Sequence, residues 1–251
     1  MTGKTHKQGG MLISIVGFAI LRAKGLLLPD VNLFLQWLII YPFCIWGSVA
    51  SDLDHHWEAC PQKDYPSWIL NHLLHITAPL QKLMDKTLSE SQKKRSFGYK
   101  VAKFFNASHR SWQTHSDLTL LLLILLLMYV LSGRITIFGT FDIAIIQMVI
   151  TGVVLGGIAH FILDMLTPEG IWLAGFSVIN TITRKHILPY KMHLVPHTKA
   201  FATGGKWELF IRKVLQVFTV IAIVWFLITI FFPNWKDYIP FELDFTNLFG
   251  G

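Results

Sequence analysis

Histidine and aspartate residues recur in this chain at the ends of apolar stretches. Imidazole and carboxylate groups are the usual protein ligands for zinc and other first-row divalent metals. His160 and Asp164 are four residues apart, so they share one face of a helix. Asp52 and Asp54 are close enough in sequence to share or bridge cations. The candidate metal ligands are His6, Asp52, Asp54, His109, His115, His160 and Asp164.

This ligand set suffices for one or two divalent ions, with zinc expected and manganese or iron as alternatives. Paired ions roughly 3.5–4 Å apart suit phosphoester hydrolysis, because they stabilise both the attacking and the leaving oxygen. Each group of ligands also has a structural alternative. His6 alone is typical of a solvated tail, and Asp52 with Asp54 is typical of a helix end followed by a cap. The His160–Asp164 pair favours function, because it interrupts a strongly apolar segment.

The elements that position these residues are expected to cross a membrane. Hydrophobic residues make up 53% of the 251 residues and charged residues only 15%, whereas soluble domains carry about 25% charged residues. A membrane-spanning helix needs roughly 20 mainly apolar residues, and we expect about five such helices. The expected spans are residues 9–28, 31–50, 118–131, 141–163 and 214–232. The fold class is therefore an all-α, polytopic membrane protein in which residues 1–251 form one membrane-embedded domain.

The Lys and Arg residues predict the orientation of these spans. Residues 51–117 and 167–213 would lie on the same side of the membrane as the N-terminus. That side carries most of the 22 Lys and Arg residues, and the exceptions are Arg22, Lys24, Arg134 and Lys236. The positive-inside rule then places the N-terminus in the cytoplasm and the C-terminus outside.

This topology brings all the candidate ligands to the cytoplasmic membrane surface, because the first two spans form a hairpin and so do the next two. Within the 51–117 segment, residues 67–88 carry apolar side chains at helical spacing. These side chains are Trp68, Ile69, Leu73, Ile76, Leu80 and Leu83. We expect this insert to form a helix lying in the membrane interface.

The order of these motifs resembles that of the YdjM-like membrane-bound metal-dependent hydrolases, a bacterial inner-membrane family. The resemblance covers the chain from His6 to about Glu208. Its residues are Thr5-His6, Asp52-Leu53-Asp54-His55, His109-Arg110, Thr114-His115-Ser116, His160, Asp164, Thr167-Pro168-Glu169-Gly170, and Thr203-Gly204-Gly205 with Glu208. The chain departs from the family pattern at Ser51, where proline is usual, and at Ser111, where glycine is usual. One extra residue also separates His109 from His115.

We therefore expect a membrane-bound metal-dependent hydrolase acting at the cytoplasmic face. A phosphoester, lipid or lipid-linked substrate is expected, because the site would lie at headgroup level. Arg110 would neutralise a phosphate or oxyanion, and Glu208 would transfer protons. Membrane lipids are the expected partners, and no nucleic acid is expected, because aromatic residues do not interleave with the basic ones.

Two other functions stay open at this point. The chain could be a non-enzymatic, metal-binding regulatory protein, or a transporter. Transporters often place charged ligands near the bilayer midplane, whereas these candidates lie at helix ends. The sequence leaves the oligomeric state open.

Overall fold

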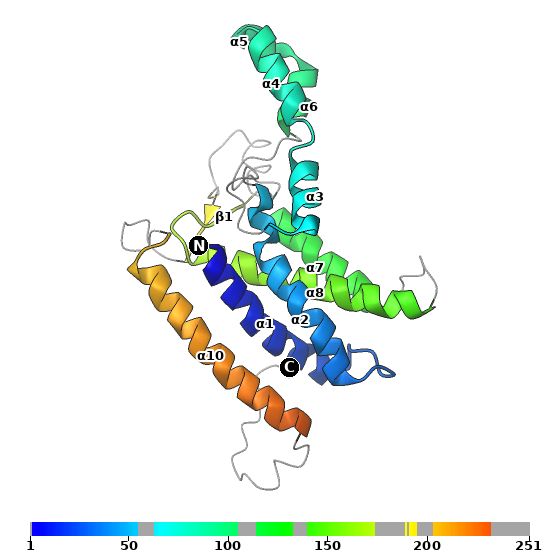
Figure 1. The fold of residues 1–251 in the computed structure, drawn as a ribbon. Helices are drawn as coiled ribbons and strands as arrows, with labels where there is room; N and C mark the ends of the chain where they lie inside the picture. Colours follow the sequence, from blue (N-terminus) through cyan, green and yellow to red (C-terminus); the bar gives the residue numbers. More distant parts are fainter. Residues whose placement is uncertain are drawn as a thin grey trace.

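The computed structural model describes residues 2–54, 63–104, 114–132, 140–173, 189, 191–194 and 203–231. The described chain is predominantly helical, with one short antiparallel pair of strands (Figure 1). The elements are α1 (Gly3–Ala23), α2 (Leu33–Ala50), the 3-10 helix η1 (Ser51–Asp54), α3 (Tyr65–Leu74), α4 (Ala78–Thr87), α5 (Glu90–Arg95), α6 (Phe97–Phe104), α7 (Asp117–Leu131), α8 (Thr140–Met165), β1 (Ile171–Trp172), β2 (Lys191–Met192) and α10 (Lys206–Phe231).

Helix α1 lies at the centre of the bundle, where it packs against α2, α8 and α10. Helix α7 packs on α8. Because protein surrounds α1, this helix can bury polar residues such as Thr5, His6 and Ser14. The core around it comprises Ile15, Phe18, Leu21, Ile40, Cys44, Met148, Leu155 and Phe226.

Glycines bring the backbones of α2 and α8 into direct contact. A Cβ atom on Gly156 would overlap the carbonyl oxygen of Cys44, and one on Gly47 would overlap the carbonyl oxygen of Val153. Small residues at such a contact allow close helix packing in membranes. Residues 152, 156, 160 and 164 of α8 follow one another at four-residue spacing, so they lie on one face. The glycine contact therefore directs His160 towards the end of α2.

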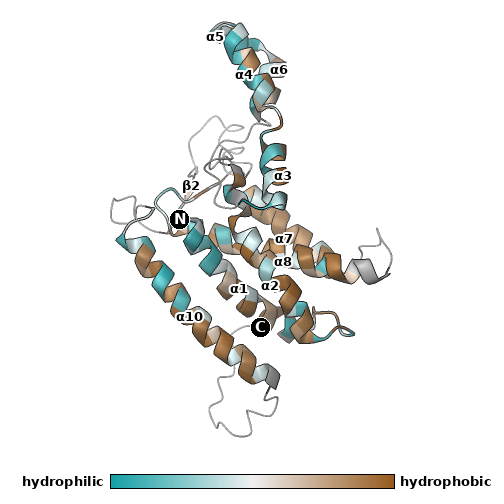
Figure 2. Ribbon diagram, in the orientation of Figure 1, coloured by the Kyte–Doolittle hydropathy of each residue, from teal (hydrophilic) through white to brown (hydrophobic). Residues whose placement is uncertain are grey.

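Among the described residues, three helices are long and apolar enough to cross a membrane: Leu33–Ala50, Ala144–Met165 and Lys206–Thr229. Their exposed apolar side chains, such as Val217, Phe218 and Ile221 of α10, are consistent with a membrane protein (Figure 2). The 15 residues of α7 span only about 22 Å, against about 30 Å of hydrocarbon. The count of five spans and the orientation of the termini stay predictions.

The predicted single helix over residues 67–88 is wrong. The structure has two helices, α3 and α4, separated at His75–Thr77, and Pro79 lies in the first turn of α4. Proline is favoured at the start of a helix, where its missing N–H costs nothing. Helices α4 to α6 extend away from the bundle at the end where α1 begins (Figure 1). The apolar residues predicted to face the interface are all exposed, and their location in the interface stays a prediction.

Candidate metal centre

Five of the predicted ligands come together at one end of the bundle. His6 lies in the second turn of α1, Asp52 in η1 and His115 just before α7, while His160 and Asp164 lie near the end of α8. All five are buried, with exposed fractions from 0% to 6%. Segments from four parts of the chain thus converge, as the hairpin topology predicts.

Five distances among four ligand atoms lie close to those of a tetrahedral metal site. Nε2 of His160 lies 3.1 Å from Nε2 of His115 and 3.3 Å from Oδ2 of Asp164, and the His115–Asp164 distance is 3.5 Å. Oδ1 of Asp52 lies 3.6 Å from Nε2 of His115 and 3.9 Å from Nε2 of His160. Four tetrahedral ligands about 2.0–2.2 Å from zinc are separated from each other by about 3.3–3.6 Å. These four side chains therefore fit one divalent ion.

The remaining carboxylate oxygens of the same two aspartates face His6. Oδ1 of Asp164 lies 3.4 Å from Nε2 of His6, and Oδ2 of Asp52 lies 3.9 Å from it. The His6 ring stacks on the His160 ring with centroids 4.0 Å apart. Each carboxylate thus lies between His6 on one side and the two rings of His115 and His160 on the other, and could hold two ions. The second position has three protein ligands, the arrangement that leaves room for water or substrate in catalytic metal sites.

The hydrogen bonds of the histidines favour a cation between these groups. Nδ1 of His160 donates to the carbonyl oxygen of Ser48 at 2.9 Å, because a carbonyl can only accept. In the neutral ring, Nε2 of His160 then carries a lone pair, and it faces Nε2 of His115 and the two carboxylates. A backbone carbonyl on the other ring nitrogen is the usual partner of a metal-binding histidine. A shared cation would satisfy the lone pair of His160 and the two carboxylates together.

His6 supplies a second, independent indication. Both of its ring nitrogens are buried and lack a hydrogen-bond partner within the described ranges. Buried polar atoms without a partner are rare in folded proteins. A cation between His6 and the two aspartates would satisfy Nε2.

Charge states support the same interpretation for Asp52 and His6, which lie outside the apolar spans. Burial raises the pKa of Asp52, but the neighbouring His160, His115 and His6 outweigh it and hold the pKa below its ordinary value. Burial lowers the pKa of His6 to about 4, with His160 acting in the same direction and the two aspartates opposing. At neutral pH the pair is therefore a carboxylate and a neutral imidazole, the forms that bind metals.

Local contacts explain how the ligands outside α8 are held. Asn71 of α3 donates to the carbonyl oxygen of Leu53 at 2.6 Å, which fixes η1 and with it Asp52. The backbone N–H of Trp172 in β1 donates to the carbonyl oxygen of His115 at 2.8 Å. The hydroxyl of Thr114 lies 2.9 Å from Nδ1 of the same histidine. The two short strands thus help to hold a ligand.

The other predicted site residues are not brought into this cluster. His109 and Arg110 lie outside the described residues, as does the side chain of Asp54. Glu208 is described, and its carboxylate accepts hydrogen bonds from Thr2, Thr5 and Gly204. These contacts give Glu208 a structural role that connects the first turns of α1 and α10. Its predicted role in proton transfer stays a prediction.

Sequence reasoning missed the residues that support the ligands. The carbonyl group of Ser48 and the glycine contact between α2 and α8 were not among the predicted site features, and Thr114 appeared only in a motif, with no role assigned. The four-residue spacing of Gly152, Gly156, His160 and Asp164 is a signal that could have identified the contact. Backbone carbonyls leave no such signal in a sequence.

Comparisons with protein-family models, with curated proteins and with solved structures give no match to this chain. The resemblance to the YdjM-like hydrolases therefore stays an expectation that rests on the motifs. What the structure adds is the convergence of buried His and Asp side chains that could hold a metal ion.

Proposed function

We propose that this protein is a membrane-bound, metal-dependent hydrolase of the YdjM-like type, acting on a phosphoester or lipid-linked substrate at the cytoplasmic face. The observation that supports this most strongly is the position of two carboxylates, those of Asp52 and Asp164, among three buried histidines. His115 and His160 lie on one side of Asp52 and Asp164, and His6 lies on the other. Such an arrangement fits two adjacent divalent ions, with zinc preferred and manganese or iron as alternatives.

Bound divalent ions would supply Lewis acidity and a water molecule of lowered pKa. The chain's own residues then have distinct tasks. Asp52 and Asp164 fix the separation of the two positions, and Ser48 and Thr114 orient the imidazoles of His160 and His115. Burial of the cluster excludes bulk water, which strengthens its electrostatic interactions. In this proposal Arg110 neutralises the substrate phosphate.

The first experiment compares metal content and hydrolysis in the detergent-purified protein. Metal is quantified by mass spectrometry in the wild type, in His160→Ala and in His72→Ala, a matched control that removes an exposed histidine. We expect one or two equivalents in the wild type and in the control, and loss of metal from His160→Ala. Release of phosphate from phosphatidic acid, and of nitrophenol from bis(p-nitrophenyl) phosphate, should follow the metal content. Absence of metal in all three proteins after reconstitution would overturn the proposal.

One observation favours a second candidate, a non-enzymatic metal-binding regulatory protein. Asp52, at 6%, is the most exposed of the five clustered ligands, so the described part of the site is nearly closed. Structural metal sites are closed, and catalytic sites keep an open position. Wild-type protein that holds metal but hydrolyses no lipid or soluble phosphoester would support this second candidate against the first.

A further inference from the structure

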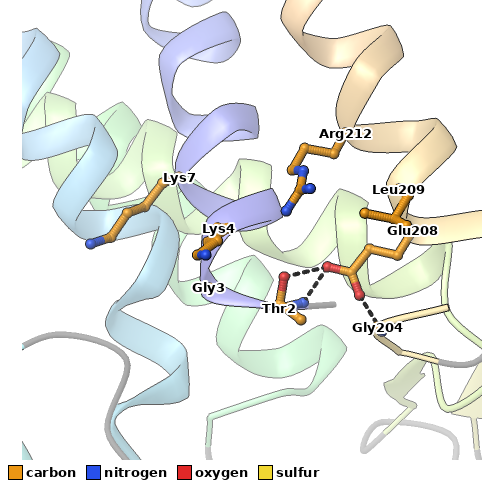
Figure 3. Close-up of a pocket in the computed structure, with 8 residues that line it drawn as sticks. All are labelled: Thr2, Gly3, Lys4, Lys7, Gly204, Glu208, Leu209 and Arg212. Atoms are coloured by element: carbon orange, nitrogen blue, oxygen red, sulfur yellow. Dashed lines mark hydrogen bonds between the residues drawn. The ribbon is translucent and has the colours of Figure 1, made fainter. Parts of the chain in front are cut away.

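A second site lies on the opposite side of α1 from the metal centre. It is a pocket of about 550 Å³ between the first turns of α1 and α10. Lys4 and Lys7 line it from α1, and Arg212 lines it from α10. Figure 3 shows Arg212 reaching from α10 towards the first turn of α1, with Glu208 and Thr2 at the base of the pocket.

The pocket carries a net positive charge. Three cations line it, against the single carboxylate of Glu208. That carboxylate is already engaged, because Thr2, Thr5 and Gly204 all donate hydrogen bonds to it. Within the part of the chain that the structure describes, no carboxylate forms an ion pair with any of the three cations. Arg and Lys side chains that no described carboxylate neutralises are suited to binding phosphate.

Helix geometry separates this pocket from the metal centre. At about 100° per residue, Lys4 and Lys7 lie about 60° apart around α1, whereas His6 lies about 160° from Lys4 and about 100° from Lys7. His6 is fully buried in the bundle, while Lys4 is exposed. The two sites therefore face different directions from the same two helical turns.

The surroundings of the pocket point to an amphiphilic ligand. Leu209 lines the pocket, and the same side of α10 continues with the exposed apolar side chains Val220, Ile223 and Leu227. In Figure 2 the first turns of α1 and α10 are hydrophilic, and the rest of α10 is largely hydrophobic. A ligand with its phosphate among the cations could lay acyl chains along α10. Free phosphate would use only the cations and not the apolar side chains of α10.

We propose that this pocket binds the phosphate group of an anionic membrane phospholipid, whose acyl chains lie along the outer face of α10. The site would fix the depth of α1 and α10 in the bilayer. It does not depend on the metal or on hydrolysis, so its failure and that of the proposed function are separable.

The test uses the full chain in mild detergent and short-chain phosphatidylglycerol as the probe, with phosphatidylcholine and inorganic phosphate at the same concentration as comparison arms. Bound lipid is counted by native mass spectrometry. The Lys4→Gln/Arg212→Gln protein is compared with Lys206→Gln/Lys213→Gln, which removes the same charge at residues that do not line the pocket. We expect phosphatidylglycerol binding to weaken about 30-fold in the first variant, about fivefold for each cation, and less than twofold in the second.

Equal weakening of phosphatidylglycerol binding in both variants would show a general surface-charge effect and would overturn the proposal that the pocket is the binding site. Displacement of the lipid by an equal concentration of inorganic phosphate would overturn the lipid assignment in favour of a free anion. If the first variant fails to fold, a photo-reactive phosphatidylglycerol on the wild-type protein decides the question. Labelled peptides containing Lys4 or Arg212 support the site, and labelling confined to other peptides rejects it.

Discussion

The first two turns of α1 present two sites of opposite character. On one side His6 is sealed inside the bundle beside two carboxylates, and on the other Lys4 and Lys7 line an open pocket. The sealed site combines neutral imidazoles with carboxylates, because isolated charges are too costly to bury. The open pocket can hold a net positive charge, because water reaches and screens its cations. Burial thus decides which charges each side of one helix can carry.

Glu208 connects the two sides. Its carboxylate lies at the base of the pocket and accepts a hydrogen bond from the hydroxyl of Thr5, the residue before His6. Its other contacts are with Thr2 on α1 and with Gly204 ahead of α10. The contact with Gly204 resembles a capping box, in which a glutamate in the first turn reaches back to a backbone N–H.

The largest effect is expected from Asp164→Asn. Asp164 directs one oxygen at His6 and the other at His115 and His160. In the proposed two-ion site the amide would therefore leave one position without its oxygen ligand and deprive both of the negative charge. We expect metal affinity to fall at least about 100-fold at both positions. His6→Ala should remove only the second position, so metal content measured by mass spectrometry should fall by about one equivalent. Equal losses in the two variants would contradict the division into two positions.

Gly156→Ala tests whether the glycine contact positions the sealed site. The added Cβ would overlap the carbonyl oxygen of Cys44, and backbone cannot yield as a side chain does. We expect destabilisation of about 3 kcal/mol, measured as a shift in thermal unfolding in detergent, together with reduced metal content. The matched control is Gly98→Ala in α6, where the new Cβ would make only ordinary contacts. That variant should be as stable as the wild type or slightly more stable.

Much of this arrangement could be predicted, and the reason is physical. Hydropathy located α2 and α7 to within about two residues of their observed bounds, because the cost of burying polar backbone in lipid leaves few alternatives. The hairpin topology then placed the ligands at one surface. Hydropathy carries no information on side-chain pairing, so it could not show that Glu208 contacts Thr2, 206 residues away. The break between α3 and α4 was missed because apolar spacing continues through it.

Glu208→Gln tests the connection between the two sites. The amide keeps one acceptor but turns an N–H₂ group towards donors, so buried hydrogen bonds are lost. We expect destabilisation of about 2 kcal/mol and partial loss of metal from the position that contains His6, with the other position retained. The control is Glu90→Gln on α5, an exposed residue, which should leave both unfolding and metal content unchanged. Full metal content in Glu208→Gln would show that the hydrogen bonds of Glu208 do not influence metal binding at His6.

The smallest effect is expected from Thr114→Val, which removes only a hydroxyl beside the sealed site. That hydroxyl lies 2.9 Å from Nδ1 of His115, and valine has nearly the same shape. Loss of such a partner leaves the imidazole less well oriented and typically weakens metal binding about 10-fold. Competition with a chelator should measure this change, while thermal unfolding of the metal-free protein should move little. Unchanged metal affinity would show that the backbone bond from Trp172 suffices to orient His115, and that the hydroxyl contributes only to packing.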